Sequence, residues 1–540
     1  MRDDSPEIAL TELPPGVAMP PKFTRLNDYL DFNAARIGDR DALVDGDRRF
    51  TWGQTLDAAE ALANAFADAG LLAGDRIAVW SVPTIESTLL YYACVRAGFV
   101  FVGLNPRFTS EEASFILDDA DVRLVYFMPK FEERSYGGDL AAMNVGAPCI
   151  PIDSAPGSAF DDQLKSHVDE ERMRALVEAV APETPVALVY TSGTTGTPKG
   201  AFLTQWGMAH NYWWILSERW CSPFKMLAHS PINHLAMLGD TVALATVAGG
   251  TQFPMERFDP RRALDLIQSE AITYYKGSPT HHLLFFRELG EHPAGDLSSI
   301  QYWYWGGAAV PAALLDLMER WSPRVGSCYG STELNGSVTF IRPGDTREQK
   351  LNTIGRPIGP YRVRLATADG IEVADGEVGE LQSRGDFHTT GYFNREAAVA
   401  DLFTPDGWMR TGDLCRRRPD GFYELVGRAK EMFKSGGYNV YPREIELRLE
   451  SHPDIAMAAV VSVPDPLWSE VGFAFVVERT AGVLDAEAVR EWARASLANY
   501  KVPKQVAILR EMPMLAVGKI DRRALREDAR AVTEDASPST

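Results

Sequence analysis

The chain has 540 residues, of which 54 are basic and 74 acidic, for a formal net charge of −20. Hydrophobic residues make up 45% of the sequence, which is typical of a globular protein and excludes a disordered chain. The negative charge and the lack of a Lys/Arg block disfavour a nucleic-acid partner. No run of 18 apolar residues occurs, so we expect no integral membrane contact.

The five cysteines are widely spaced and form no CxxC pair, which disfavours a disulfide framework and a zinc ribbon. The first residues, MRDDSPE, are acidic and lack the apolar stretch of a signal peptide. We therefore expect a cytoplasmic protein with reduced thiols. The oligomeric state stays open, with a homodimer as one alternative.

After a Pro-rich and acidic start, strand-like runs alternate with helical patterns. Residues 76–80 and 123–127 read as strands, and a helix is expected between them at 85–98. The pattern continues through strands at 272–275 and 300–305. This alternation predicts an α/β protein with layered α/β subdomains and parallel sheet.

The pattern changes near Gly355, where short alternating strands with Gly and Asp turns predict a small β-rich lobe. A compact α+β region follows, in which Pro464 is expected to end a strand at 458–463. The other elements expected there are helices at 445–449 and 486–498 and a strand at 473–477.

These patterns predict a large N-terminal domain and a small C-terminal domain. The boundaries are an arm at 1–22, the N-terminal domain at 23–429, the C-terminal domain at 430–528 and a disordered tail at 529–540.

The segment with the clearest chemistry is YTSGTTGTPKG at residues 190–200. It follows an apolar strand at 186–189, and Thr204 is placed to cap a helix that begins at Gln205. Its glycines let the backbone approach a ligand, and its hydroxyls and Lys199 offer donors to phosphate oxygens. The pattern GxxxxGK[ST] does not fit it, so it is not a Walker A loop. A flexible surface linker is the alternative.

This segment resembles the phosphate loop of the adenylate-forming superfamily of acyl-CoA synthetases, luciferases and peptide-synthetase adenylation domains. Further motifs of that superfamily follow in its order over residues 25–528. They are GGAAVP at 306–311, YGSTE at 329–333, RTGD at 410–413, GRAK at 427–430, SGGYNVYP at 435–442 and VGKID at 517–521.

The resemblance implies an ATP site, a Mg²⁺ site and a CoA site. Glu333 is the expected hard-oxygen ligand for Mg²⁺, and Thr191 is a second candidate; a solvated surface charge is the alternative for Glu333. Asp413 and Arg428 are expected on the ribose, although a Thr-Gly-Asp sequence also suits a plain turn. The other expected nucleotide- and CoA-binding residues are Ser192, Gly193, Thr194, Thr195, Gly307, Ala308, Tyr329, Gly330, Lys430, Gly436 and Gly437.

The resemblance also implies that Lys519 bridges the carboxylate and the α-phosphate, where a compact ammonium neutralises two anions. Val517 stands where a small hydroxyl residue is frequent, which puts one minor contact in doubt. Lys434 is expected to act in the second step after rotation about Lys430. The other expected catalytic residues are Glu333, Thr332, Lys199 and His234.

His234 lies in PINH at 231–234, which resembles the acyl-pocket motif of the superfamily, and a packed loop histidine is the alternative. Asn233 and His234 replace the Asp that amino-acid-activating relatives carry, so an amino acid substrate is disfavoured. We expect a monocarboxylate with an apolar body: fatty, alicyclic or aryl. The expected pocket lining contains no Arg and consists of His234, Leu235, Met237, Thr280, His281, Trp305, Tyr329, Leu334 and Asn335.

The motifs together predict an acid–CoA ligase whose partners are a small carboxylic acid, ATP and CoA. It forms an acyl-adenylate from Mg·ATP and then a CoA thioester with release of AMP. Two alternatives stay open: an adenylating enzyme that delivers the acyl group to a carrier protein or another acceptor, and a non-catalytic ligand-binding relative.

Overall fold

The computed structural model describes residues 19–191, 198–291, 295–322, 324–359, 361–514 and 520–535. The chain divides into two compact units, Met1–Val363 with Ser383–Met409, and Arg364–Gln382 with Arg410–Thr540. In these described ranges no helix is both long and apolar enough to cross a bilayer.

The first unit contains a six-stranded sheet in the order β10-β9-β4-β3-β5-β8. All pairs are parallel except β9 with β10. The strands are β3 (Arg76–Trp80), β4 (Val100–Leu104), β5 (Val122–Phe127), β8 (Cys149–Pro151), β9 (Pro185–Thr191) and β10 (Lys199–Thr204).

A nine-stranded sheet completes the first unit, in the order β17-β16-β15-β14-β13-β11-β12-β1-β2. Its central strands are parallel and its outer pairs antiparallel. The strands are β1 (Asp41–Asp45), β2 (Arg48–Thr51), β11 (Lys225–Ala228), β12 (Thr251–Pro254), β13 (Tyr274–Gly277), β14 (Tyr302–Trp305), β15 (Val325–Ser331), β16 (Gly336–Ile341) and β17 (Arg356–Pro357).

Helices cover both sheets. The helical elements of this unit that matter below are α1 (Leu26–Ile37), α2 (Trp52–Asp68), α3 (Ile85–Ala97), α4 (Ser110–Asp119), α5 (Tyr136–Met143), α6 (Ala159–Leu164), α7 (Glu170–Ala179), α8 (Gln205–Glu218), α9 (Leu235–Met237), η1 (Leu238–Ala243), α10 (Leu244–Ala248), α11 (Pro260–Glu270), α12 (Pro279–Glu291), α13 (Ala312–Trp321), α14 (Arg347–Asn352) and α15 (Glu396–Leu402).

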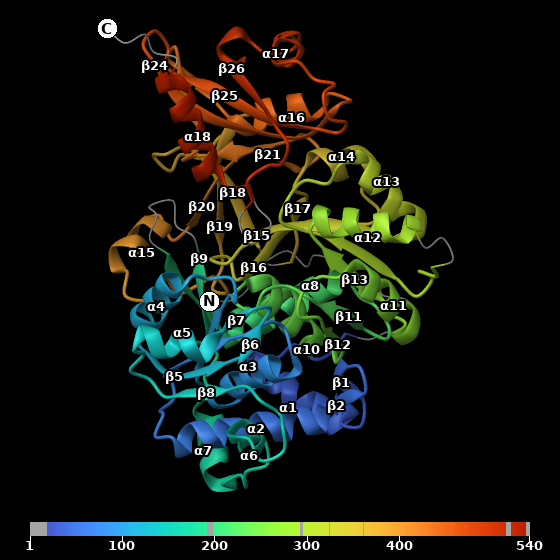
Figure 1. Cartoon of the computed structure of the whole chain (residues 1–540), viewed down its shortest axis with the longest axis vertical. Helices are drawn as coiled ribbons and strands as arrows, with labels where there is room; N and C mark the ends of the chain where they lie inside the picture. Colours follow the sequence, from blue (N-terminus) through green and yellow to red (C-terminus); the bar gives the residue numbers. More distant parts are fainter. Residues whose placement is uncertain are drawn as a thin grey trace. The chain divides into compact units, whose positions relative to one another are not determined.

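Strand alternation sends side chains into separate cores. In β3, Ile77 and Val79 join the core that contains α2, α3 and α8, whereas Ala78 and Trp80 join the core under α4 and α5. In β14, Tyr302 and Tyr304 join the first of these cores, and its Trp side chains pack with α11, α12 and α13, which lie side by side in Figure 1. One layer of helices therefore packs against both sheets.

The second unit contains a four-stranded sheet, β18-β19-β20-β21, and a five-stranded sheet, β23-β22-β25-β24 with β26 beside β25. The five-stranded sheet is covered by α16 and α17 on one face and by α18 on the other. The elements are β18 (Arg362–Ala366), β19 (Val378–Arg384), β20 (Met409–Arg417), β21 (Tyr423–Arg428), β22 (Phe433–Ser435), β23 (Tyr438–Val440), α16 (Pro442–Glu450), β24 (Ile455–Asp465), β25 (Ser469–Glu478), α17 (Ala486–Arg494), β26 (Gln505–Leu509) and α18 (Arg522–Asp535).

The predicted fold class, an α/β protein with a large N-terminal and a small C-terminal domain, is confirmed. Two local expectations are wrong. β24 runs through Pro464 to Asp465, because an edge strand tolerates a residue without an N–H. The expected tail at 529 begins inside α18, where Ala529 is buried in the core.

The compact units divide at Met409, earlier than the predicted boundary at 429/430. The antiparallel pairing within the four-stranded sheet joins the β-rich lobe to the C-terminal part of the chain. Which peptide bond acts as the hinge stays a prediction.

Candidate active site

The predicted phosphate loop joins two antiparallel strands. β9 ends at Thr191, β10 begins at Lys199, and these two residues pair across the ladder. The predicted helix start is confirmed, because α8 begins at Gln205 with Thr204 as its cap; β10, which lies between the loop and this helix, was not predicted. The predicted residues Ser192, Gly193, Thr194 and Thr195 lie outside the described residues.

Glu333 lies beside both ends of this loop. Its Oε1 is 3.5 Å from the Thr191 hydroxyl, which donates to it, and the Tyr392 hydroxyl donates to the same oxygen at 3.0 Å. The Lys199 ammonium lies 5.4 Å from the centre of the Tyr392 ring. The fold thus brings Glu333 beside the loop ends Thr191 and Lys199, which lie far earlier in the sequence.

Tyr392 belongs to none of the predicted motifs. Burial and then the charge of Glu333 raise the pKa of Tyr392 well above its usual value, so the hydroxyl keeps its proton and donates to the carboxylate. The available signal was a glycine, Gly391, followed by an aromatic hydroxyl after two threonines. Gly391 has φ 139°, which a side chain rarely adopts, and so it fixes the turn that presents Tyr392.

The oxygen groups at Glu333 fit Mg²⁺. In the described residues no cluster of three or more His, Cys, Asp or Glu could hold a metal. Mg²⁺ is commonly bound through one or two carboxylates together with substrate phosphates. One carboxylate beside a threonine hydroxyl matches that ligand set, whereas it does not match a dedicated zinc or calcium cage.

The two motifs predicted to bind adenine lie at the carboxyl ends of neighbouring parallel strands: the motif at 306–311 follows β14, and the motif at 329–333 begins in the last residues of β15. Ligands of open α/β sheets bind at this carboxyl edge. Gly307 and Ala308 are exposed there, Tyr329 is half-buried, and Thr332 is buried. An added Cβ on Gly330 would lie 1.9 Å from the carbonyl oxygen of Gly336, so only glycine fits in this pairing.

His234 caps the short helix α9. Its Nδ1 accepts a hydrogen bond from the N–H of Ala236 at 3.0 Å. The side chain is half-buried. This hydrogen bond fixes the orientation of the His234 ring. The ring belongs to the loop at 231–234, which was predicted to line the acid pocket.

The other residues expected to line the acid pocket do not all lie on one face of the nine-stranded sheet. His281 packs on His229 and Phe258, with ring centroids 4.9 and 4.7 Å away. Trp305, expected in the lining, instead packs with α11 to α13. Strand alternation turns its neighbour Tyr304 to the other face, where an added Cβ on Gly306 would lie 2.3 Å from the Tyr304 hydroxyl.

In the second unit the two predicted ribose residues contact each other. Asp413 and Arg428 are opposite in the β20–β21 ladder, and Arg428 Nε lies 2.9 Å from Asp413 Oδ1. The Asp413 side chain is 7% exposed and that of Arg428 53%, so the arginine can reach a ligand while it holds the carboxylate. Sequence analysis missed Glu380, which accepts from the N–H of Gly412 at 3.0 Å and from Arg410 at 3.1 Å.

The residues expected in the second step surround a tight turn. Lys430 and Lys434 are exposed. Gly436 and Gly437 have φ 58° and 87°, and an added Cβ on Gly436 would lie 2.5 Å from the Trp468 ring. Lys519 lies outside the described residues.

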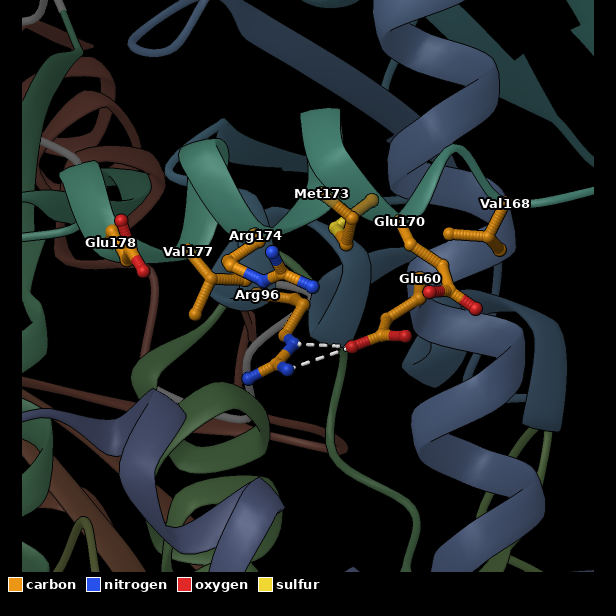
Figure 2. A pocket seen from close by; sticks show the side chains of 8 residues that line it. All are labelled: Glu60, Arg96, Val168, Glu170, Met173, Arg174, Val177 and Glu178. Carbon is orange, nitrogen blue, oxygen red and sulfur yellow. Dashed lines mark hydrogen bonds and ion pairs between the residues drawn. The ribbon is translucent and has the colours of Figure 1, made fainter.

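A surface cavity of the first unit is separate from these residues. Figure 2 shows Arg96 directed at Glu60, whose Oε1 accepts from Arg96 Nε at 3.0 Å and Nη2 at 2.7 Å. The cavity is formed by α2, α3, α7 and Val168, two residues before α7, and none of these carries a predicted site residue. Its lining is Glu60, Arg96, Val168, Glu170, Met173, Arg174, Val177 and Glu178.

Comparison with known protein families gives two matches in chain order. Residues 30–393 match the model described as AMP-binding enzyme, and residues 444–519 match the AMP-binding enzyme C-terminal domain.

Similar proteins span nearly the whole chain. A 3-[(3aS,4S,7aS)-7a-methyl-1,5-dioxo-octahydro-1H-inden-4-yl]propanoyl:CoA ligase of Mycobacterium tuberculosis is 33% identical, covering 92% of this chain and 97% of that protein. A feruloyl-CoA synthase of Amycolatopsis is 33% identical over 90% of this chain and 95% of its own length. The crystal structure of ATP-bound MatB from Rhodopseudomonas palustris has a TM-score of 0.84 at 25% identity, covering 94% of this chain and 99% of that one.

Proposed function

This chain belongs to the AMP-binding enzyme family and is an ATP-dependent acid–CoA ligase, and from that premise we propose which residues carry its two half-reactions. In the first, a carboxylate attacks the α-phosphorus of ATP and releases pyrophosphate. In the second, the CoA thiol attacks the acyl carbonyl and releases AMP. Neither step needs a covalent nucleophile on the enzyme, so the residues act by positioning and by charge stabilisation.

Glu333 is the centre of the first half-reaction. The observation that supports this role is the meeting of its carboxylate with Thr191, at the end of β9, and with Tyr392. Lys199 adds a cation for the phosphates at the other end of the loop. Lys519 is the proposed bridge between the substrate carboxylate and the α-phosphate. Thr332, next to Glu333, is proposed to contribute its hydroxyl to the same step.

Glu333 and Thr191 would hold Mg²⁺. The ion supplies positive charge to the phosphate oxygens when it is bound. The Tyr392 hydroxyl fixes the orientation of the carboxylate through its hydrogen bond. This is the usual task of groups that contact metal ligands.

Asp413 and Arg428 bind the ribose in the proposed enzyme. Arg428 holds the Asp413 carboxylate in place, and the carboxylate oxygens can accept from two sugar hydroxyls. Gly307, Ala308, Tyr329 and Gly330 form the adenine side, at the carboxyl ends of β14 and β15.

The C-terminal unit contributes different residues to the two steps. Lys519 belongs to adenylation, whereas Lys434 and the Gly436–Gly437 turn belong to the reaction with CoA. Small residues at that turn leave room for a pantetheine arm. In this proposal the C-terminal unit rotates about Lys430 between the adenylation step and the reaction with CoA.

The acid is a carboxylate with a largely apolar body. The acids named for relatives differ widely, from feruloyl and medium or long fatty chains to indoleacetate and sulfoacetate, so family membership does not fix it. The sheet face behind the His234 loop is rich in aromatic side chains, including Tyr274, Tyr302 and Tyr304. Each buried CH₂ adds about 0.8 kcal/mol of binding until such a site is full.

The test is acid-dependent exchange of pyrophosphate into ATP without CoA. We expect exchange with wild-type protein and Mg²⁺, and its loss on chelation. Glu333→Gln should lower exchange roughly 10²-fold, because a charge-stabilising group is removed. The control is Glu171→Gln at an exposed position of α7, which should leave exchange unchanged. Equal exchange in the Glu333→Gln protein would remove Glu333 from the metal site.

A further inference from the structure

One face of the nine-stranded sheet carries an unusual group of polar side chains. Lys276 on β13 is directly opposite Tyr304 on β14, and Tyr274 is opposite Tyr302. These four side chains point to the same side, because neighbouring parallel strands share their alternation. That side is the one packed against α8 and η1, away from α11 to α13.

Two cations are buried at this face. Lys276 is 5% exposed, and its ammonium donates to the Thr241 hydroxyl at 2.6 Å and to the carbonyl oxygen of Ala236. Arg219, which follows α8, has no exposed surface; its guanidinium lies 3.9 Å from the Tyr304 ring centre and donates to the Tyr274 hydroxyl at 3.2 Å.

Several polar atoms here have no partner among the described residues. They are Nε and Nη2 of Arg219, Oδ1 of Asp240 and the hydroxyl of Tyr212. A buried polar group without a hydrogen bond costs free energy, and a buried charge costs more. Each such group calls for a partner that these side chains do not supply, whether a water, an ion or a ligand.

The Lys276 ammonium keeps its charge near neutrality. Burial lowers the pKa of Lys276 to about 8, and Arg219 acts in the same direction, whereas Asp240 opposes them. Two cations, Lys276 and Arg219, thus lie near one carboxylate, that of Asp240 in η1. The surplus positive charge and the unpartnered N–H groups of Arg219 both favour an oxygen acceptor over an apolar group.

Tyr304 and Lys276 both contact segments that were predicted to border the acid site. The Tyr304 hydroxyl lies against Gly306, at the start of the adenine-side turn, and 3.0 Å from Cys328 Sγ. Lys276 holds the carbonyl of Ala236, which lies between the predicted lining residues Leu235 and Met237. Neither cation belongs to a superfamily motif, so no pattern in the sequence indicated Lys276 or Arg219.

We propose that the acid carries a second oxygen function, remote from the activated carboxylate, that accepts hydrogen bonds from Lys276 and Tyr304 with Arg219 behind the Tyr304 ring. A ketone and a second carboxylate share this chemistry. The proposal rests on the acid–CoA ligase function and names the class of its substrate. It replaces the expectation of a purely apolar acid body.

The experiment compares matched acids. One set is octanoate, 7-oxooctanoate and octanedioate; the other is 3-cyclohexylpropanoate, 3-(4-oxocyclohexyl)propanoate and 4-(2-carboxyethyl)cyclohexanecarboxylate. AMP formation with ATP, Mg²⁺ and CoA gives kcat/KM for each acid. We expect wild type to favour at least one oxygenated acid over its plain partner by about tenfold or more, since a site built to hydrogen-bond rejects the analogue that lacks the group. The ketone and carboxylate arms identify which oxygen it is.

The discriminating measurement is the ratio of kcat/KM between partners, which does not depend on how much protein is folded. Lys276→Met and Tyr304→Phe should each reduce that ratio several-fold, with the plain acid retained. The control is Lys350→Met, another buried lysine, paired with Glu319 on α13, which should keep the ratio.

Equal use of plain and oxygenated acids by wild type would overturn this inference and leave the ligase function intact. An unchanged ratio in Lys276→Met and Tyr304→Phe would do the same. Loss of AMP formation with every acid would instead overturn the ligase function, and this inference with it.

Discussion

Glu333 acquires its role from residues far along the chain. Thr191 and Tyr392 are 142 and 59 positions away, yet both hydroxyls donate to the same carboxylate oxygen. The motif at 329–333 predicted Glu333, and the loop at 190–200 predicted Thr191. Nothing in either motif indicates Tyr392, because its position depends on how the segment after β19 returns to the six-stranded sheet, where Tyr392 bridges to Ala201.

Tyr392→Phe tests that contact. The change removes one donor to Glu333 and leaves the ring, so we expect adenylation to fall about tenfold, in the range seen when a group supporting a metal ligand is lost. Pyrophosphate exchange measured against Mg²⁺ concentration should show a higher Mg²⁺ requirement. Tyr126→Phe removes a comparable hydroxyl on β5, which donates to Gln163 of α6, and should not alter the Mg²⁺ requirement.

His282 gives the protein a pH-dependent stability. Burial lowers the pKa of His282 to about 4, and its Nε2 donates to the carbonyl of Tyr304 at 2.9 Å. The unfolded chain, with an ordinary pKa near 6.5, binds more protons between pH 6.5 and 4, so the stability from neutral His282 is complete above about 6.5 and is lost as pH falls towards 4. Denaturant unfolding should show a shallower fall over this range in His282→Gln. The exposed His167→Gln is the control, and an equal fall in wild type and His282→Gln would exclude this histidine.

At the scale of elements, sequence patterns were most successful where strands are buried on both faces. β3 and α3 match their expected ranges within a residue or two, because unbroken apolar runs and a helical period identify them. The failures have local causes. β10 was not expected, since its glycine and threonine content suits a loop, and β24 passes Pro464 because it lies at a sheet edge.

The β15–β16 pair depends on a glycine. An added Cβ at Gly330 would meet the Gly336 carbonyl at 1.9 Å, so Gly330→Ala must separate the two strands on either side of the turn that contains Thr332 and Glu333. We expect a loss of about 1–3 kcal/mol in the free energy of unfolding, as for other overpacked sites, and a several-fold fall in pyrophosphate exchange. Gly344→Ala, at a position with open space for the Cβ, should change neither. Equal stability of the two variants would show that the pair adapts without strain.

At the scale of the whole molecule, the two-unit organisation could be predicted, but its division could not. The change of texture near Gly355 and the motif at 427–430 both indicated breaks. The compact units divide elsewhere because β19 and β20 pair across a long insertion that returns to the first unit. Pairings between distant strands leave no local signal in one sequence.

Lys430→Pro tests the proposed change of arrangement. Proline fixes φ, so the variant should slow the reaction of acyl-adenylate with CoA by about tenfold or more and affect adenylation less. Lys519→Ala should do the opposite. Rapid-quench measurement of adenylate formation and of its consumption by CoA separates the steps. If both variants slow both steps equally, the two-arrangement proposal is wrong.

The helix layer shared by the two sheets of the first unit constrains how such an enzyme diversifies. A substitution on the inner faces of α3 or α8 is felt by both sheets at once, because one continuous core contains side chains from each. Few single changes there satisfy both neighbours. We therefore expect the changes that adapt such an enzyme to a new acid to gather in the turns at the strand ends, outside this shared core. The scaffold can stay constant while the chemistry it accepts changes one residue at a time.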